Sequence, residues 1–360
     1  MEEIENNQLQ SPAPEPKKKK RTGLKIALTV IAIILLLLLL VGIFGFIYLN
    51  RLMNLIGRTD GTLKPMSSSE MEEFMQNNTD AYDPEYTGET VDPTDVTWED
   101  ATDPIEQGEN IINIMLIGQD RRPGEIRARS DAMILCTLNR TTKTLTLTSF
   151  MRDMYIPIPG YNDNRINVSY VFGGMKLLDQ CLYDSFGVEV DGNFEVDFDG
   201  FTDVIDTVGG VSITLTAAEA KFINGATASG NTLKEGVNHL NGEQALTYAR
   251  IRNIGNSDFG RTQRQRNVIN AVIQQCRSLS VTELYSLMEQ VLPLMTTDLT
   301  NAQIWEYAAQ AIPLLPELKI ESLRIPVDGG YKSAWVSKMS VLIPDLKVNR
   351  EVLAELFKDA

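Results

Sequence analysis

An uncharged apolar run, residues 26–49, constrains this chain more than any other feature of its sequence. The run consists mainly of Ile and Leu and follows a basic block, KKKKR, at 17–21. About 20 apolar residues span the core of a bilayer, and this run has neither the polar face of a surface helix nor the cleavage site of a secretory signal. Because the basic block precedes it, the N-terminus is expected to stay in the cytoplasm. The sequence therefore predicts a basic cytoplasmic tail at 1–25 and a single-pass transmembrane signal anchor at 26–49.

The next segment, 50–109, has the composition of a linker. From Pro65 to Asn110 there is no Lys or Arg, while Glu and Asp recur among Pro, Thr and Gly. A segment with high net charge and little apolar surface does not gain enough from burial to offset the entropy of ordering. We expect an acidic extracytoplasmic linker here, followed by one folded domain at 110–360.

Composition excludes several classes of protein. The chain of 360 residues has a formal net charge of -15, which argues against nucleic acid as a partner, because such proteins need a basic binding face. The three cysteines, Cys136, Cys181 and Cys276, are widely spaced and fit neither a disulfide framework nor a zinc site. The single histidine, His239, would have to serve any Ser-His-Asp triad or His-based metal site. The motifs G-x-S-x-G, Walker A and G-x-G-x-x-G are all absent.

The folded domain mixes strands and helices. IINIMLIGQD reads as a buried strand, and two β-rich runs at 132–138 and 144–150 flank a turn at 139–143, which predicts a hairpin. Further strands are expected at 188–196 and 211–215, and helices at 176–186, 200–208, 241–249 and 261–279. This order predicts a mixed α/β fold, with a central sheet covered by helices on both faces as an α-β-α sandwich.

Charged residues at the ends of the expected strands mark a candidate site. Asp120 closes the first strand, Asp131 opens the hairpin, and Arg152 closes it, with Asp153 placed to orient Arg152. Strand ends that border loops are where a sheet presents a site. Two carboxylates at one edge suit Mg²⁺, which takes one or two carboxylates together with phosphate oxygens.

A cluster of arginines follows in YARIRNIGNSDFGRTQRQR, residues 248–266. Arg250 and Arg252 would project to one side of extended backbone, and Arg261 and Gln265 would share a helix face. Asp258 is expected just before that helix, as its N-cap, where backbone N–H groups favour anions. Guanidinium groups bind phosphate in a bidentate way. With the two carboxylates, this cluster predicts a site for a pyrophosphate and a metal, the alternative being a solvated helix face.

These motifs resemble those of the LytR-CpsA-Psr phosphotransferases, bacterial envelope enzymes anchored by one N-terminal helix. The resemblance runs from about Asn113 to Ile273 and is carried by NIMLIGQD, RSD, the RD of SFMRD, RINVSYVFGG, IDTVGGV, HLNGEQALTYARIR and DFGRTQRQRNVI. It implies an enzyme that takes a glycopolymer from an undecaprenyl-pyrophosphate carrier and transfers its phosphosugar end to peptidoglycan. Teichoic acid, capsule and a protein glycan all stay open as the polymer.

The resemblance also implies a role for each candidate residue. The expected ligands of Mg²⁺ are Asp120 and Asp131. The expected catalytic residues, four arginines on the pyrophosphate oxygens and one candidate general base, are Arg152, Arg250, Arg252, Arg261 and Asp258. The expected further substrate-binding residues are Arg129, Arg165 and Gln265. The polyprenyl chain would lie in an apolar tunnel between the sheet and the helices.

Three positions and two other functions complete the expectations. Ala132 after RSD and Met151 before RD stand where the family usually has Thr and Pro, which affects rate and substrate preference more than the reaction. Arg266 is expected on the solvent side of its helix. A non-catalytic envelope receptor or attenuator that binds polyprenyl pyrophosphate stays open as an alternative. So does a polyprenyl-pyrophosphate hydrolase that uses no acceptor.

Overall fold

The computed structural model describes residues 45, 47–48, 50–67, 69–71, 74, 83, 85–98, 104–119, 128–228, 232–255, 257–277 and 279–358. The expected cytoplasmic tail, nearly all of the expected anchor, and Asp120 lie outside these residues. Within the described ranges, no helix is long and apolar enough to cross a membrane. The chain divides into one unit that ends at Arg51 and a second that begins at Leu52. The fold and the candidate site belong to the second unit.

A seven-stranded mixed sheet forms the centre of this unit, in the order β1-β10-β7-β2-β3-β4-β11. In that order the strands are Gly57–Arg58, Thr296–Thr297, Gly192–Asp197, Ile111–Gln119, Ser130–Asn139, Thr144–Phe150 and Lys319–Ile325. Strands β2, β3 and β4 are antiparallel neighbours, whereas β7 runs parallel to β2 and β11 runs parallel to β4. The mixed sheet confirms the predicted fold class.

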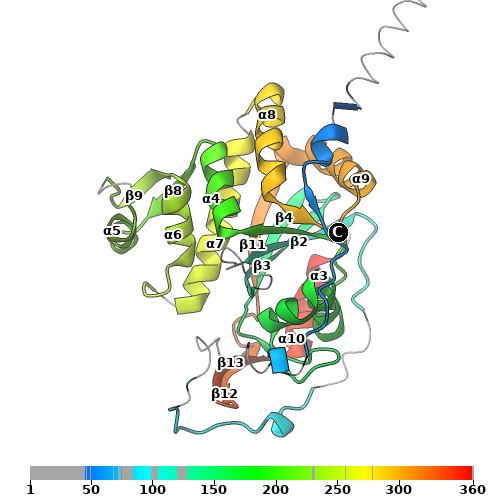
Figure 1. Ribbon diagram of the computed structural model, residues 1–360, viewed down its shortest axis with the longest axis vertical. Helices are drawn as coiled ribbons and strands as arrows, with labels where there is room; N and C mark the ends of the chain where they lie inside the picture. Colours follow the sequence, from blue (N-terminus) through cyan, green and yellow to red (C-terminus); the bar gives the residue numbers. More distant parts are fainter. Residues whose placement is uncertain are drawn as a thin grey trace, which may run out of the picture. The chain divides into compact units, whose positions relative to one another are not determined.

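Helices cover both faces of this sheet (Figure 1). Helices α3, Ile166–Phe186, and α10, Leu346–Leu356, lie on one face. On the other face, α7, Ser257–Arg277, contacts β3, β4 and β11. Figure 1 shows three more helices on the side of α7, namely α4, Phe198–Thr207, α6, Gly242–Arg250, and α8, Val281–Val291.

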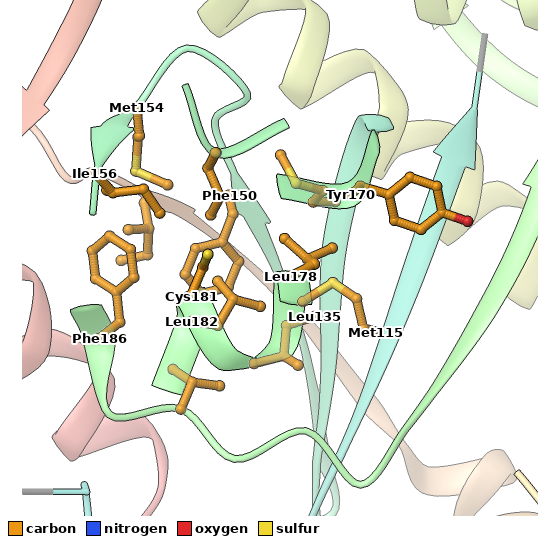
Figure 2. Packing of buried hydrophobic residues seen from close by; sticks show 14 of the residues in the cluster. Met115, Leu135, Phe150, Met154, Ile156, Tyr170, Leu178, Cys181, Leu182 and Phe186 are labelled. Atoms are coloured by element: carbon orange, nitrogen blue, oxygen red, sulfur yellow. The ribbon is translucent and has the colours of Figure 1, made fainter. Parts of the chain in front are cut away.

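The largest hydrophobic core lies between the sheet and α3. Figure 2 shows Met115, Leu135 and Phe150 of the strands beside Leu178 and Leu182 of α3, and all five are at most 2 % exposed. These strand residues alternate with side chains that face the other way, because successive residues of a strand point to opposite faces. The rigid core fixes the hairpin of β3 and β4, which carries part of the candidate site.

The expected hairpin at 132–150 is present. Asn139 Oδ1 accepts hydrogen bonds from the backbone N–H groups of Thr141 at 3.0 Å and Thr142 at 2.9 Å, and Lys143 adopts a left-handed φ of 54°. Asparagine favours such turns because its side chain replaces a backbone acceptor. Since β3 and β4 are antiparallel, the start of β3 and the end of β4 meet at one edge of the sheet. Asp131 and Arg152 are therefore brought together by the turn at the opposite end.

Part of the range expected to be a linker contributes to this fold. Besides β1, the segment 59–63 lies at a kink of α3, where Gly174 has φ 75° and ψ -158°. Lys176 N donates to Gly61 O at 2.9 Å, and Leu63 N donates to Gly173 O at 3.3 Å. A Cβ on Gly174 would lie 2.8 Å from Gly61 O, so only glycine allows both the backbone conformation and this close approach. Helix α3 is also longer than the helix expected at 176–186.

The lone histidine has the structural role that its position suggests. It lies in β9, Gly236–Leu240, which pairs with β8, Val211–Leu215, outside the main sheet. His239 Nε2 lies 2.7 Å from Gly209 O and bridges the turn that precedes β8. The three cysteines are free thiols. Burial raises the pKa of the Cys136 and Cys181 thiols to about 12, so they are inert at neutral pH.

A buried carboxyl in α3 makes the stability of the domain depend on pH. Asn193 Nδ2 donates to Asp179 Oδ2 at 2.9 Å and to Asp298 Oδ2 at 2.8 Å. Burial, together with the charge of Asp298, raises the pKa of Asp179 to about 7, although the Asn193 hydrogen bond opposes the change. In the unfolded chain the pKa of this carboxyl is about 4. Between these two values the folded state binds more protons, so the free energy of unfolding falls as pH rises.

We therefore expect the Asp179→Asn variant to become more stable than the parent, in free energy of unfolding, by an amount that grows as pH rises. The neutral amide removes the cost of a buried charge, so the variant should gain stability relative to the parent from about pH 5 to about pH 8. Denaturant unfolding at both pH values measures this difference. Asp95→Asn, at an exposed carboxyl, is the control. A parent and an Asp179→Asn variant with the same pH dependence would contradict the assignment.

Candidate active site

Four charged side chains from three chain segments meet where β3 begins and β4 ends. Arg152 Nη1 donates to Asp131 Oδ1 at 2.7 Å. Arg261 Nη1 lies 2.9 Å from Asp258 Oδ1, both in the first turns of α7. The charges of Arg152 and Arg261 both act on Asp131, which joins the two ion pairs into one electrostatic cluster.

Arg252 adds a third guanidinium to this cluster. Its Nε lies 3.9 Å from Asp258 Oδ1, and its charge also acts on Asp131 and Arg261. Burial and then the charge of Arg152 lower the pKa of Arg261 to about 10, so it stays protonated at neutral pH. Three cations thus face two carboxylates, and the excess positive charge favours an anionic ligand.

Asp131 is ionised in this setting. Burial alone raises the pKa of its carboxyl, but the charges of Arg152, Arg261 and Arg252 outweigh burial and lower the pKa below its ordinary value. Its Oδ1 accepts from Arg152, while its Oδ2 accepts no hydrogen bond from the part of the chain that the structure describes.

An ionised carboxylate with an open oxygen fits Mg²⁺. No group of three or more acidic, His or Cys side chains that could hold a metal occurs among the described residues. Asp131 is the described member of the expected pair of ligands. Strand β2 ends at the same edge, with Gln119 paired to Ser130. Asp120, the other expected ligand, follows Gln119 and lies outside the described residues. The described half of the site therefore fits the expected ion.

Asp153 contacts both Arg152 and Arg165. Asp153 Oδ1 lies 3.4 Å from Arg152 Nε and 2.9 Å from Arg165 Nη1. Arg165 also donates to Ser340 O from Nε at 3.1 Å and from Nη2 at 2.5 Å. The structure thus places Arg165, expected to bind substrate, as a buried contact between Asp153 and the hairpin that contains Ser340.

Arg250 is not brought into the ion-pair cluster. Helix α6 extends through Arg250, so Arg250 and Arg252 do not share the extended backbone that the sequence suggested. The guanidinium carbon of Arg250 lies 4.3 Å from the centre of the Phe198 ring at the start of α4. This cation–π contact leaves the exposed side chain at the margin of the site.

The positions of Asp258, Gln265 and Arg129 complete the comparison with the expected residues. Asp258 lies within the first turn of α7, because that helix begins at Ser257, so the expectation of an N-cap position was wrong. Gln265 lies one turn after Arg261, is half-buried, and makes no side-chain hydrogen bond to the described residues. Arg129 is half-buried directly before β3.

Two further arginines of α7 are buried. Arg266, expected on the solvent side, is 5 % exposed and donates from Nη1 to Ser149 Oγ at 2.6 Å, so that expectation was wrong. Arg264 is 6 % exposed and pairs with Glu219 at 2.7 Å. The signal that could have found Arg264 is its helical spacing of three residues from Arg261, which gives both the same buried face.

Comparison with known proteins identifies the family of this chain. The family model described as "LytR_cpsA_psr family" matches residues 70–358. The chain belongs to the LytR_cpsA_psr family. The match spans every strand of the sheet except β1, both helical layers and every described residue of the charged cluster.

Relatives and solved structures extend the comparison. The chain is 33% identical over 226 residues to the polyisoprenyl-teichoic acid–peptidoglycan teichoic acid transferase TagU of Bacillus mycoides (strain KBAB4), covering 62% of this chain and 71% of TagU. It is 31% identical over 261 residues to the transferase TagT of Bacillus subtilis (strain 168), covering 71% of this chain and 77% of TagT. A structure titled "TagT bound to LI-WTA" superimposes with a TM-score of 0.58 at 25% identity and covers 78% of this chain and 97% of that one. A structure of YwtF (TagT) with bound octaprenyl pyrophosphate lipid has a TM-score of 0.53 at 25% identity, with the same coverage of both chains.

Proposed function

We propose that this chain is an envelope transferase that moves a glycopolymer from an undecaprenyl-pyrophosphate carrier to peptidoglycan by phosphoryl transfer. The observation that carries the proposal is the cluster of Arg152, Arg252 and Arg261 around the ionised Asp131. Excess positive charge beside a carboxylate suits a diphosphate that arrives with a metal ion. Relatives named teichoic acid transferases and a related structure with a bound prenyl pyrophosphate support the assignment.

The arginines would bind the diphosphate and stabilise the charge that builds on the leaving lipid phosphate. Phosphoryl transfer depends mainly on positioning and charge neutralisation, and a cluster of arginines provides both. Mg²⁺, held by Asp131 and Asp120, would neutralise part of the diphosphate charge when bound. Asp153 keeps the Arg152 guanidinium in place, because its Oδ1 contacts both Arg152 and Arg165.

Asp258 is the candidate general base for the acceptor sugar hydroxyl. Its side chain is 29 % exposed, so an acceptor can reach it, whereas the Arg261 side chain that it contacts is 4 % exposed. Arg261 Nη1 lies 2.9 Å from Asp258 Oδ1 in an ion pair that keeps the carboxylate beside the arginine cluster. A base must lie within hydrogen-bond reach of the proton that it accepts, and Asp258 lies beside two of the proposed diphosphate ligands.

The prenyl chain is proposed to lie between the sheet and its helices. It has to start at the charged edge, where β3 begins and β4 ends, because its diphosphate end would bind there.

Turnover of a prenyl-pyrophosphate-linked oligosaccharide tests this function. The full chain in detergent should attach the oligosaccharide to a peptidoglycan acceptor and release the lipid phosphate, in the presence of Mg²⁺. Release of lipid phosphate at the same rate without an acceptor would indicate a hydrolase instead. Binding without any turnover would indicate a receptor. Mass spectrometry of the products separates the three outcomes and, with different donors, identifies the polymer.

Asp131→Asn is expected to weaken the Mg²⁺-dependent binding of a short prenyl pyrophosphate by about 10–100-fold. The amide keeps the shape of the carboxylate but removes the charge that would hold the metal. Calorimetry with and without Mg²⁺ measures the effect, and Asp203→Asn, at an exposed carboxyl of α4, is the control. Equal gains from Mg²⁺ in the parent and in Asp131→Asn would exclude Asp131 as a ligand.

The membrane anchor at 26–49 is proposed from the sequence. If it crosses the bilayer with its basic end in the cytoplasm, a protease added to intact protoplasts should release a fragment of the size of the folded domain. Cleavage that occurs only after lysis would contradict this orientation.

A further inference from the structure

Arg252 is carried by the loop between α6 and α7, and a single guanidinium binds the backbone on both sides of it. Arg264 Nη1 donates to Ile251 O at 3.1 Å, and Arg264 Nη2 donates to Ile254 O at 2.7 Å. Ile251 directly precedes Arg252, and Ile254 follows Asn253. The two hydrogen bonds therefore fix the chain before and after the residue that faces the anion site.

The third edge of the same guanidinium is anchored outside the loop. Arg264 Nε donates to Glu219 Oε1 at 2.7 Å, and the two residues are 6 % and 7 % exposed. Glu219 is itself held in place, because its Oε2 accepts from the N–H and the hydroxyl of Thr216, both at 2.9 Å, in the capping box of helix α5, Ala217–Ala226. The planar guanidinium thus connects a fixed carboxylate to two loop carbonyls, a geometry that an ammonium group cannot reproduce.

The loop needs such a support because the direct contacts of Arg252 are weak. Its charge repels Arg261, where it adds to that of Arg152 in lowering the pKa, and attracts Asp131, whose pKa it also lowers. Its side chain is 39% exposed, and its one ion-pair contact among the described residues is at 3.9 Å, to Asp258. These opposing and distant interactions do not fix the loop, so its position depends on its backbone contacts.

Two glycines suit the backbone to Arg264 in different ways. A Cβ on Gly260, in α7, would lie 3.1 Å from Arg264 Nη1, which is tighter than most contacts of this kind. A Cβ on Gly255 would only make an ordinary contact with Nη2 at 3.9 Å, but Gly255 has a positive φ of 76°, which lets the loop turn just before α7.

We propose that Arg264, held by Glu219, is a positioning residue that keeps Arg252 in the anion site. The inference rests on the proposed function of that site, since it concerns how the site is preorganised. Arg264 donates to backbone carbonyls and to Glu219, so it acts through Arg252. A displacement of about 1 Å in a positioning group can cost on the order of 10²-fold in rate.

The test uses the full chain in detergent, with Arg264→Lys, Glu219→Gln, Arg252→Ala and the double variant Arg252→Ala/Arg264→Lys. Arg266→Lys is the matched control, because Arg266 is a buried arginine of the same helix that bonds Ser149 and Gln263 and not the loop. Amide hydrogen exchange reports on the loop at 251–255, and calorimetry with inorganic pyrophosphate and Mg²⁺ reports on the anion site.

We expect Arg264→Lys and Glu219→Gln to speed amide exchange in the loop and to weaken pyrophosphate binding by about 10-fold or more, while Arg266→Lys leaves both unchanged. In the double variant, Arg264→Lys should add almost nothing to the loss caused by Arg252→Ala, because residues that act through one another are not additive. Unchanged loop exchange in Arg264→Lys, or losses that add in full, would overturn the proposal. Pyrophosphate binding that is unaffected in Arg252→Ala, with faster loop exchange in Arg264→Lys, would instead contradict the proposed function and leave the loop support in place.

Discussion

Replacing Arg261 with lysine is expected to slow transfer by about 10²–10³-fold while the protein stays folded. Arg261 is 3 % exposed, and its Nη1 already holds Asp258 at 2.9 Å. One guanidinium can therefore bind the candidate base and a diphosphate oxygen at the same time. Lysine keeps the positive charge but has no planar fork, so it cannot hold both partners in a fixed geometry.

The rate of lipid-phosphate release at saturating donor, measured beside the melting temperature, checks this result. Arg277→Lys is the control, because Arg277 ends the same helix and donates to Gln274 and to Leu318 O, away from the cluster. The control should transfer at the parental rate. An Arg261→Lys variant with parental activity would mean that charge alone, without the bidentate geometry, accounts for the arginine cluster.

The charged edge of the sheet could be predicted from the sequence because it depends on local patterns. The β-rich runs at 132–138 and 144–150 and the turn at 139–143 between them predict the hairpin. An antiparallel hairpin necessarily brings Asp131 and Arg152 to the same edge, where the structure has them 2.7 Å apart. The mixed sheet with helices on both faces followed from the order of the elements.

Long-range contacts of polar groups could not be predicted in this way. Hydrophobic periodicity treats every arginine as exposed, yet Arg264 and Arg266 are buried against Glu219 and Ser149, which lie far away in the chain. Such pairings depend on tertiary structure, because a buried charge is stable only beside a partner that the fold supplies. The same reason explains why Arg165 faces Ser340 and Asp153 rather than solvent.

Element boundaries were the other source of error, and they matter for the site. Helix α7 begins at Ser257, ahead of the expected start at Arg261, which moves Asp258 from a cap to the first turn. Helix α6 extends through Arg250, which turns this side chain toward Phe198. The start of α7 moves by four residues and the end of α6 by one, and either change redirects a charged side chain, since each helical residue rotates by about 100°.

Arg266→Ala is expected to lower the free energy of unfolding by about 2–4 kcal/mol. The substitution removes the partner of Ser149 Oγ, which then lies buried without its hydrogen bond, and the bond from Nη2 to Gln263 at 2.7 Å is lost as well. It also leaves a space beneath α7 where the side chain was. Replacing a solvent-exposed arginine with alanine would cost less than about 0.5 kcal/mol. The measurement therefore distinguishes a buried Arg266 from an exposed one.

The cost of burying the Arg266 charge opposes this loss of stability, and a methionine variant isolates that cost. Burial and then the charge of Arg324 lower the pKa of Arg266 to about 10, so the folded state holds the guanidinium at a cost. Arg266→Met removes that charge while it still fills most of the space, and we expect it to be clearly less destabilising than Arg266→Ala. Denaturant unfolding of both variants at neutral pH measures the difference. An alanine variant as stable as the parent would place Arg266 in solvent. A methionine variant less stable than alanine would mean that methionine does not fit the space beneath α7 that the arginine occupies.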